Sequence, residues 1–174
     1  MRIFCFAGPN GSGKSTIVKL KYEHHLYMPF INADNIAASE QLSHIDDNYE
    51  RNIKAANMAK DMRENRLKRK KDFMFETVMS DVTSSNNKLD FLKRAKSEGA
   101  EINILYVLTR DKEINVQRVA KRVSEGGHNV PLEKIRTRYD KCLKVLPEVL
   151  ETSDNAIVYD ILVNIIISSC IKRG

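Results

Sequence analysis

The chain reads Gly8-Pro9-Asn10-Gly11-Ser12-Gly13-Lys14-Ser15-Thr16 near its first residue, and this run fits the pattern G-x-x-x-x-G-K-[ST] at every specified position. An apolar, strand-like segment precedes it and a segment with helical spacing follows it. A phosphate-binding loop (P-loop) requires this setting, because the glycines let backbone N–H groups turn inward and the helix adds a partial positive charge. We therefore predict that residues 8–16 bind a nucleotide, with Lys14 at the β- and γ-phosphates and Ser15 as a ligand of Mg²⁺.

The size and composition indicate one folded domain. The chain has 174 residues, of which 42% are hydrophobic and 30% charged. A chain of this length can bury a single hydrophobic core without disulfides or metal ions. No repeat and no Pro/Gly-rich linker divides it. We therefore predict one P-loop domain over residues 1–174.

Three features favour a cytoplasmic location. The cysteines Cys5, Cys142 and Cys170 are far apart and form no C-x-x-C pair, which is typical of a reducing compartment. No signal peptide precedes the P-loop. The apolar tail, residues 156–171, contains Asp160 and is shorter than the roughly 20 residues of a membrane-spanning helix. We therefore expect no contact with a membrane.

Apolar runs that alternate with segments of helical spacing predict the fold class α/β. Because a helix joins each strand to the next, most strands should be parallel, in a three-layer α/β/α arrangement with about five strands. The breaker-rich loop at 125–131 suggests a mobile helical lid over about residues 111–140. The predicted strands are 2–7, 30–32, 72–76, 102–108 and 156–159, and the predicted helices are 14–24, 46–70, 84–97, 111–124 and 132–150.

Two carboxylates follow predicted strands directly. Asp34 comes after the second strand and Glu76 after the apolar part of the third. The carboxyl ends of parallel strands meet at one edge, beside the P-loop, and a kinase needs a carboxylate there to take the proton of the acceptor hydroxyl. Asp34 is therefore a candidate base, and Glu76 a candidate acceptor contact. The alternative for Asp34 is a helix N-cap, because Asn32, Asp34 and Asn35 all precede a short helical stretch.

Arginines are dense in and after the predicted lid. Arg118 and Arg122 are four residues apart and share one helical face, and Arg136 and Arg138 follow the loop at 125–131. The planar guanidinium suits phosphate because it donates two parallel hydrogen bonds. Each arginine could equally belong to a solvated helix face, but a cluster beside a P-loop favours phosphate binding.

Four stretches together resemble the zeta-toxin-like P-loop kinases. The P-loop alone is shared with many families, whereas Gly-Gly-His-x-Val-Pro before Arg-x-Arg-Tyr is much more specific to the small branch of this group, often described as predicted ATPases. The resemblance covers roughly residues 2–160 and not the tail at 161–174, which departs from the family pattern. The stretches are the P-loop, Ile31-Asn32-Ala33-Asp34-Asn35-Ile36, Phe75-Glu76-Thr77, and Arg118-Val119-Ala120-Lys121-Arg122-Val123-Ser124-Glu125-Gly126-Gly127-His128-Asn129-Val130-Pro131 with Arg136-Thr137-Arg138-Tyr139.

The resemblance implies a core like that of nucleoside-monophosphate kinases and a transfer of the γ-phosphate of ATP or GTP to a small molecule. In well-characterised zeta toxins the acceptor is a UDP-linked N-acetyl amino sugar, and a small antitoxin protein blocks the nucleotide site. By the same resemblance, Asp34 looks like the catalytic base, and Glu76 and Thr77 look like acceptor contacts. The arginines of the lid look like phosphate contacts: Arg118, Arg122, Arg136 and Arg138.

A small-molecule kinase that uses Mg²⁺ is our leading interpretation, and two others stay open. Residues 63–71 hold six basic residues against one acidic, and the net charge is +6, which would suit a polynucleotide 5′-hydroxyl kinase. This run lacks the interleaved aromatic residues that single-strand binding favours, so we expect no nucleic-acid partner. The third interpretation is a non-catalytic nucleotide-binding module or one half of a toxin–antitoxin pair.

Overall fold

The computed structural model describes residues 1–22, 27–80, 87–160 and 165–169. Its centre is a six-stranded sheet in the order β2-β3-β1-β4-β5-β6. The first five strands in this order pair in parallel, and β6 pairs antiparallel with β5. The strands are β1 (Arg2–Ala7), β2 (Phe30–Ile31), β3 (Phe73–Thr77), β4 (Glu101–Leu108), β5 (Asn155–Asp160) and β6 (Ile165–Ser169).

The α/β prediction with about five mostly parallel strands is confirmed, and β6 is an addition. The sequence indicated that the tail at 161–174 departs from the family pattern, and its central part forms the outermost strand of this sheet. Residues 161–164 and 170–174, including Cys170, lie outside the described residues. Within the described part of the chain, no helix is both long enough and apolar enough to cross a membrane.

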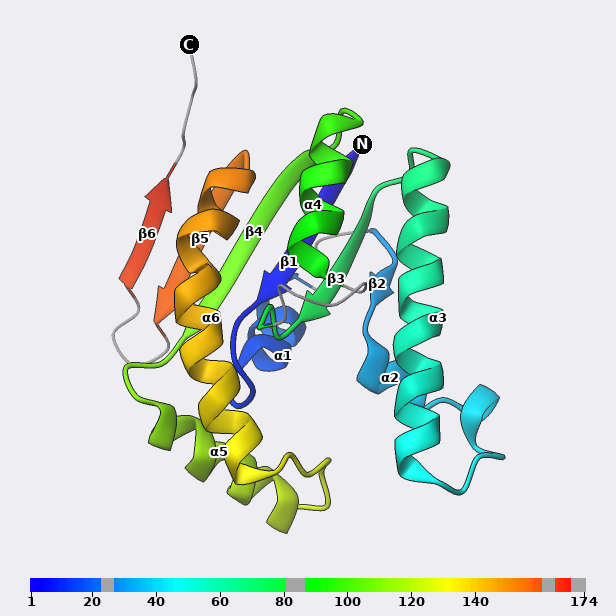
Figure 1. Cartoon of the computed structure of the whole chain (residues 1–174), viewed down its shortest axis with the longest axis vertical. Coiled ribbons are helices and arrows are strands. Elements are labelled where there is room, and N and C mark those ends of the chain that lie inside the picture. The colour runs from blue at the N-terminus through cyan, green and yellow to red at the C-terminus, as the bar shows by residue number, and fades with distance from the viewer. Residues whose placement is uncertain (23–26, 81–86, 161–164, 170–174) are drawn as a thin grey trace.

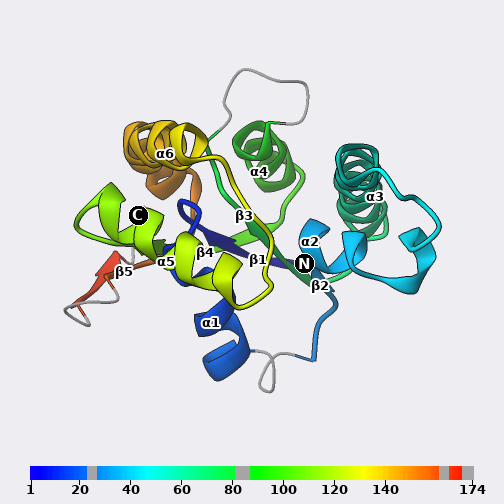
Figure 2. The same cartoon turned by 90° about the horizontal axis from the view of Figure 1, so that it is seen from below.

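Helices cover the two faces of the sheet unequally. Helices α3, α4 and α6 lie together on one face, and α1 lies on the other (Figures 1 and 2). Helix α5 lies beyond the carboxyl end of the strands, next to the loop that follows β1 (Figure 2). The helices are α1 (Lys14–Ile17), α2 (Ala33–Ala37), α3 (Asn48–Lys68), α4 (Lys88–Ser97), α5 (Lys112–Ser124) and α6 (Leu132–Thr152).

Alternation along β1 divides the core between these two faces. Ile3, Cys5 and Ala7 are buried in the larger apolar cluster, with residues of α3, α4 and α6. Phe6 joins the smaller cluster with Ile17 and its neighbours from α1. Successive strand side chains point to opposite faces, so this short strand contributes to both layers. Its carboxyl end is thereby fixed between β3 and β4, where the P-loop begins.

The helix predicted at 14–24 differs more from the observed structure than the other predicted helices do. Helix α1 spans four residues and continues as a π-helical segment, Val18–Tyr22. Residues 23–26, which include His24, lie outside the described residues. The wider turn begins directly after the P-loop, as π-helical segments often do at functional sites. The other predicted helices are confirmed where the structure describes them, with ends that shift by a few residues.

Candidate active site

The P-loop leaves β1 through glycines that no other residue could replace without strain. Gly8, Gly11 and Gly13 have φ angles of 139°, 76° and 94°. A Cβ atom on Gly8 would lie 2.1 Å from the carbonyl oxygen of Val107, and one on Gly11 would lie 2.6 Å from that of Asn115. The loop is therefore pressed between β4 and α5, and its shape depends on the absence of side chains at these positions.

Replacement of Gly11 by alanine should therefore weaken both folding and nucleotide binding. We expect Gly11→Ala to lower the free energy of unfolding by about 1–3 kcal/mol more than Gly99→Ala, as measured by urea denaturation. Gly99 is the matched control because its φ is 88° and nothing lies within 4 Å of the added Cβ. Equal losses in the two variants would show that contact with α5 does not shape the loop.

Three side chains meet where the P-loop turns into α1. The Ser15 hydroxyl lies 3.0 Å from each carboxylate oxygen of Glu76. The ammonium of Lys14 lies 4.0 Å from the same carboxylate and donates a hydrogen bond of 2.9 Å to the Pro9 carbonyl. The side chains of Lys14 and Glu76 are only 6% and 12% exposed. Glu76 at the end of β3 therefore faces the position at which Ser15 would hold a metal ion.

Burial sets the charge behaviour of this cluster. It lowers the pKa of Lys14, and the nearby carboxylates of Glu76 and Asp34 act in the opposite direction. It raises the pKa of Glu76, against the effect of the Lys14 ammonium and the hydrogen bond from Ser15. Because Asp34 affects the pKa of both groups, its carboxylate belongs to the same electrostatic site.

Asn32 connects this cluster to Asp34. Its side-chain oxygen accepts hydrogen bonds from the backbone N–H groups of Asp34 (2.8 Å) and Asn35 (3.3 Å), and so caps α2. Its amide nitrogen donates to Glu76 at 3.1 Å. The residue that caps the helix is therefore Asn32, and Asp34 lies exposed in the first turn. The sequence included Asn32 only as one of three capping candidates, because its contact with Glu76 joins residues 44 positions apart.

Helix α5 brings arginines to the opposite side of the loop. Asn115 and Val119 are buried against Gly11. Arg118 is three positions after Asn115 and Arg122 is three positions after Val119, so both flank the face that contacts the loop. The Arg122 guanidinium lowers the pKa of Lys14, which indicates that its charge reaches the site, and it donates a hydrogen bond of 2.7 Å to the His128 carbonyl. The arginine thus ties α5 to the loop that precedes α6.

The two arginines of α6 have different surroundings. Arg138 donates a hydrogen bond of 3.1 Å to the side chain of Asn10, in the P-loop itself. Arg136 donates to both carboxylate oxygens of Glu113, at 2.8 and 3.0 Å, and to Glu133 at 3.3 Å. The structure therefore brings Arg138 to the P-loop, whereas two carboxylates already hold Arg136.

Thr77 lies directly after Glu76 at the edge of the site. Its hydroxyl accepts a hydrogen bond of 3.3 Å from the backbone N–H of Met79. Met79 is buried and has a φ of 53°, an uncommon value for a residue that is not glycine. Residues 81–86, which follow this turn, lie outside the described residues. Thr77 therefore stabilises a strained turn next to the predicted acceptor position.

The residues present fit a nucleoside triphosphate with its metal ion. The loop has the left-handed glycines and the buried lysine that a phosphate cradle requires. The hydroxyl of Ser12 and the side-chain nitrogen of Asn115 are buried beside the loop without a hydrogen-bond partner among the described residues. The hydroxyl of Ser15 and the carboxylate of Glu76 are hard oxygen donors of the kind that Mg²⁺ prefers.

Comparison with known proteins agrees with this geometry. The chain matches the profile of an AAA domain family over residues 3–142. A Haemophilus influenzae protein described as uncharacterized is 28% identical over 139 residues, which are 77% of this chain and 89% of that protein.

Solved structures with the same fold include a kinase, a chain of a toxin–antitoxin system and a chain of another two-protein complex. A chain of the PezAT toxin–antitoxin system of Streptococcus pneumoniae has a TM-score of 0.72 at 16% identity, over 99% of this chain and 72% of that one. A chain of the AvrRxo1-ORF1:AvrRxo1-ORF2 complex has a TM-score of 0.73 at 13% identity, over 96% and 57%. Shikimate kinase from Acinetobacter baumannii has a TM-score of 0.53 at 18% identity, over 89% and 82%. The chain belongs to the AAA domain family, whose profile it matches over most of its length, and it shares its fold with these solved structures.

Proposed function

We propose that the protein is a Mg²⁺-dependent kinase that transfers the γ-phosphate of ATP or GTP to a hydroxyl group of a small molecule. The observation that carries this proposal is the pair of carboxylates in front of the P-loop. Glu76 is buried against Lys14 and Ser15, while Asp34 is exposed at the start of α2. One carboxylate thus faces the P-loop, and the other is exposed where an acceptor could reach it.

These two positions suit different tasks. Asp34 would accept the proton of the acceptor hydroxyl while the hydroxyl oxygen forms its bond to the γ-phosphorus, and the bond to the β–γ bridging oxygen would break to release ADP or GDP. Glu76 and Ser15 would hold Mg²⁺, which neutralises phosphate charge when it is bound. This role for Glu76 replaces the acceptor contact that the resemblance implied, because its carboxylate is turned toward Ser15. Thr77 remains a proposed acceptor contact.

The arginines would complete the site from the lid. Arg118, Arg122 and Arg138 lie on α5 and α6, which flank the P-loop on the side opposite α2. In this position they would donate to phosphate oxygens and stabilise the charge on the transferred group. A closed lid would also keep water from the γ-phosphate, which favours transfer over hydrolysis. Arg136 would join them only after it leaves Glu113.

The acceptor can be identified by incubating the purified protein and Mg-ATP with pooled UDP-sugars, nucleosides and a 5′-hydroxyl oligonucleotide. The expected result in mass spectrometry is the addition of one phosphate to a single small molecule, with UDP-N-acetyl amino sugars as the first candidates. Addition only to the oligonucleotide would favour a polynucleotide kinase. If no acceptor gains phosphate while nucleotide still binds, the proposal of a small-molecule kinase is wrong.

The raised pKa of Glu76 predicts a specific dependence of stability on pH. The folded protein binds the Glu76 proton more tightly than the unfolded chain, whose pKa is near the ordinary 4.5. This group therefore contributes stability at low pH that is lost as the pH rises from about 4.5 through the folded pKa. Glu76→Gln cannot titrate and should lose less stability over this range.

The effect is measured by urea denaturation of both proteins from pH 4.5 to pH 8. Over this range the free energy of unfolding should fall further for wild type than for Glu76→Gln. The extra loss should be about 1.4 kcal/mol for each unit by which the folded pKa exceeds the unfolded one. Glu40→Gln, which removes an exposed carboxylate from the segment between α2 and α3, serves as the control. If the stability of wild type and of Glu76→Gln changed with pH in the same way, the raised pKa of the buried Glu76 carboxyl group would be contradicted.

We also propose a cytoplasmic kinase with a protein inhibitor, because two structures with this fold come from toxin–antitoxin or two-protein complexes. An inhibitor that covers the P-loop would compete with nucleotide. A small partner protein recovered with the chain should therefore dissociate more readily as the ATP concentration rises. A partner whose affinity is independent of ATP would exclude this arrangement.

A further inference from the structure

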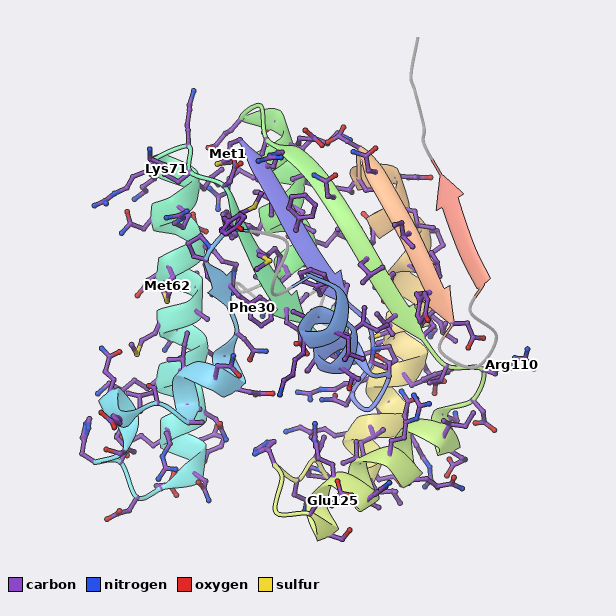
Figure 3. All side chains as sticks on the ribbon, turned by 180° about the vertical axis from the view of Figure 1, so that it is seen from behind. Met1, Phe30, Met62, Lys71, Arg110 and Glu125 are labelled. Carbon is purple, nitrogen blue, oxygen red and sulfur yellow. The ribbon has the colours of Figure 1, made fainter. Side chains whose placement is uncertain are left out.

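A basic hollow lies at the end of the sheet opposite the P-loop. Its volume is about 480 Å³. Met1 and Lys71 lie at this end of the molecule, and Arg110 and Glu125 lie at the other (Figure 3). The hollow is therefore separate from the candidate active site. Its lining comes from the start of β1, the segment before β2, and the end of α3: Arg2, Tyr27, Met28, Pro29, Arg66, Lys70, Lys71 and Asp72.

The charge of the hollow is strongly positive and only partly compensated. Four of the lining side chains are cationic and one is acidic. Arg2 already binds that acid, Asp72, through its backbone N–H (2.8 Å) and through two guanidinium nitrogens (3.0 and 2.9 Å). Lys70 and Lys71 are exposed and are in none of the ion pairs between described residues. An anion that enters the hollow would therefore meet uncompensated positive charge.

Arg66 brings a fixed positive charge to the lining of the hollow. One of its terminal nitrogens donates to the backbone carbonyl of Asp72, which fixes the guanidinium at the wall of the hollow. Its Nε atom is buried without a hydrogen-bond partner among the described residues. That atom is covered by protein and does not itself face the hollow, so the guanidinium contributes through its charge, held in one position by the bond to Asp72.

The lining of the hollow also contains apolar and aromatic residues. Tyr27 is fully exposed, with a relative exposure of 102%, and Met28 and Pro29 continue the chain from it toward β2. Residues 63–71 contain no aromatic residue, which argued against nucleic-acid binding from the sequence alone. In the folded protein, Tyr27 lines the same hollow as the last lysines of that basic segment. Cationic groups and an exposed ring in the same lining match a phosphate and a flat base.

The position of the lysines at a helix end does not explain this arrangement. Lysine and arginine side chains near the carboxyl end of α3 complement the helix dipole wherever they point. The dipole of α3 does not explain why Arg2, from β1, and the exposed ring of Tyr27 line the same hollow. Lys70 also has a φ of 51°, so that the chain turns sharply between α3 and β3 and places Lys70 and Lys71 on the hollow.

We propose that this hollow binds a nucleotide unit, with its phosphate on Arg66, Lys70 and Lys71 and its base on the ring of Tyr27. The unit is either a free mononucleotide or part of a single strand. Neither source requires the P-loop, and the site would function whether or not the protein is a kinase.

The test uses fluorescence anisotropy with a labelled single-stranded RNA of twelve uridines, and unlabelled UMP as competitor. All proteins carry Lys14→Met, so that the buried cation of the P-loop is absent from every protein compared. We expect Lys70→Gln with Lys71→Gln to raise the Kd about tenfold or more, and to reduce the slope of log K against log salt by about 1.4, or about 0.7 for each phosphate contact. Lys54→Gln with Lys144→Gln is the control, because it makes the same change in net charge at exposed residues away from the hollow.

Variants of Tyr27 distinguish recognition of a base from general electrostatic attraction of a polyanion. Tyr27→Leu should weaken binding about tenfold, whereas Tyr27→Phe, which keeps the ring, should bind as the parent does. Competition by UMP at the hollow would identify a mononucleotide site, and its failure would identify a strand. The proposal is overturned if neither ligand binds, if the two lysine pairs behave alike, or if Tyr27→Leu has no effect.

Discussion

Lys14→Met should reduce phosphoryl transfer by about a thousandfold or more. The Lys14 ammonium is the buried cation of the P-loop, 6% exposed, and no other described lysine or arginine is buried beside the loop. A cation held in a dry site stabilises the charge of the transferred group far more than one in water. Methionine keeps most of the side-chain volume and removes only the charge. The measurement is the rate of ADP formation with acceptor at saturating Mg-ATP.

Lys19→Met provides the control for this variant. Lys19 is exposed in the π-helical segment just after α1, so that its replacement changes the net charge equally but not the site. We expect wild-type rates from it. Circular dichroism should show that both variants are folded. Activity of Lys14→Met within tenfold of wild type would mean that the loop does not hold the transferred phosphate.

Asp34→Asn should reduce transfer by about a hundredfold to ten-thousandfold, the usual contribution of a general base, and leave nucleotide affinity nearly unchanged. Transfer and nucleotide affinity should respond differently because Asp34 is exposed in α2, whereas Lys14 and Ser15 would hold the phosphates. The helix should remain intact, because its cap is the Asn32 side chain. Nucleotide binding is measured by calorimetry, and turnover by the release of ADP.

Asp46→Asn is the matched control, since Asp46 is an exposed aspartate in the segment that leads into α3. It should have the activity of the wild type. A variant Asp34→Asn that transfers phosphate at the wild-type rate would exclude Asp34 as the base. Weak nucleotide binding together with weak transfer would instead indicate that Asp34 holds the nucleotide.

The fold and the nucleotide side of the site could be predicted because their determinants are local. The P-loop is one continuous run, and the alternation of Ile3, Cys5 and Ala7 with their neighbours is visible in six residues of sequence. Asp34 and Glu76 were found because the carboxyl ends of parallel strands converge on one edge. Strand β6 was missed because its apolar run follows β5 without a recognisable turn.

Contacts between distant segments could not be predicted in this way. The approach of Arg138 to Asn10 joins residues 128 positions apart. Arg136 and Glu133 are three residues apart in α6, so their ion pair could have been suspected from helical spacing. Glu113, the other partner of Arg136, lies in α5, and the sequence gives no local sign of this contact. Tyr27 and Lys71 share a hollow only after folding. Which charges meet across elements depends on packing that no local pattern encodes.

The most direct test of the central claim is the fate of the γ-phosphate. ATP labelled at this phosphate is incubated with the protein, with and without the acceptor pool, and the label is followed into acceptor and into inorganic phosphate. We predict that the acceptor accelerates ADP formation and receives one label for each ADP formed, with little release to water. Label that appears only as inorganic phosphate at a rate independent of acceptor, or no turnover despite tight nucleotide binding, would contradict a phosphotransferase.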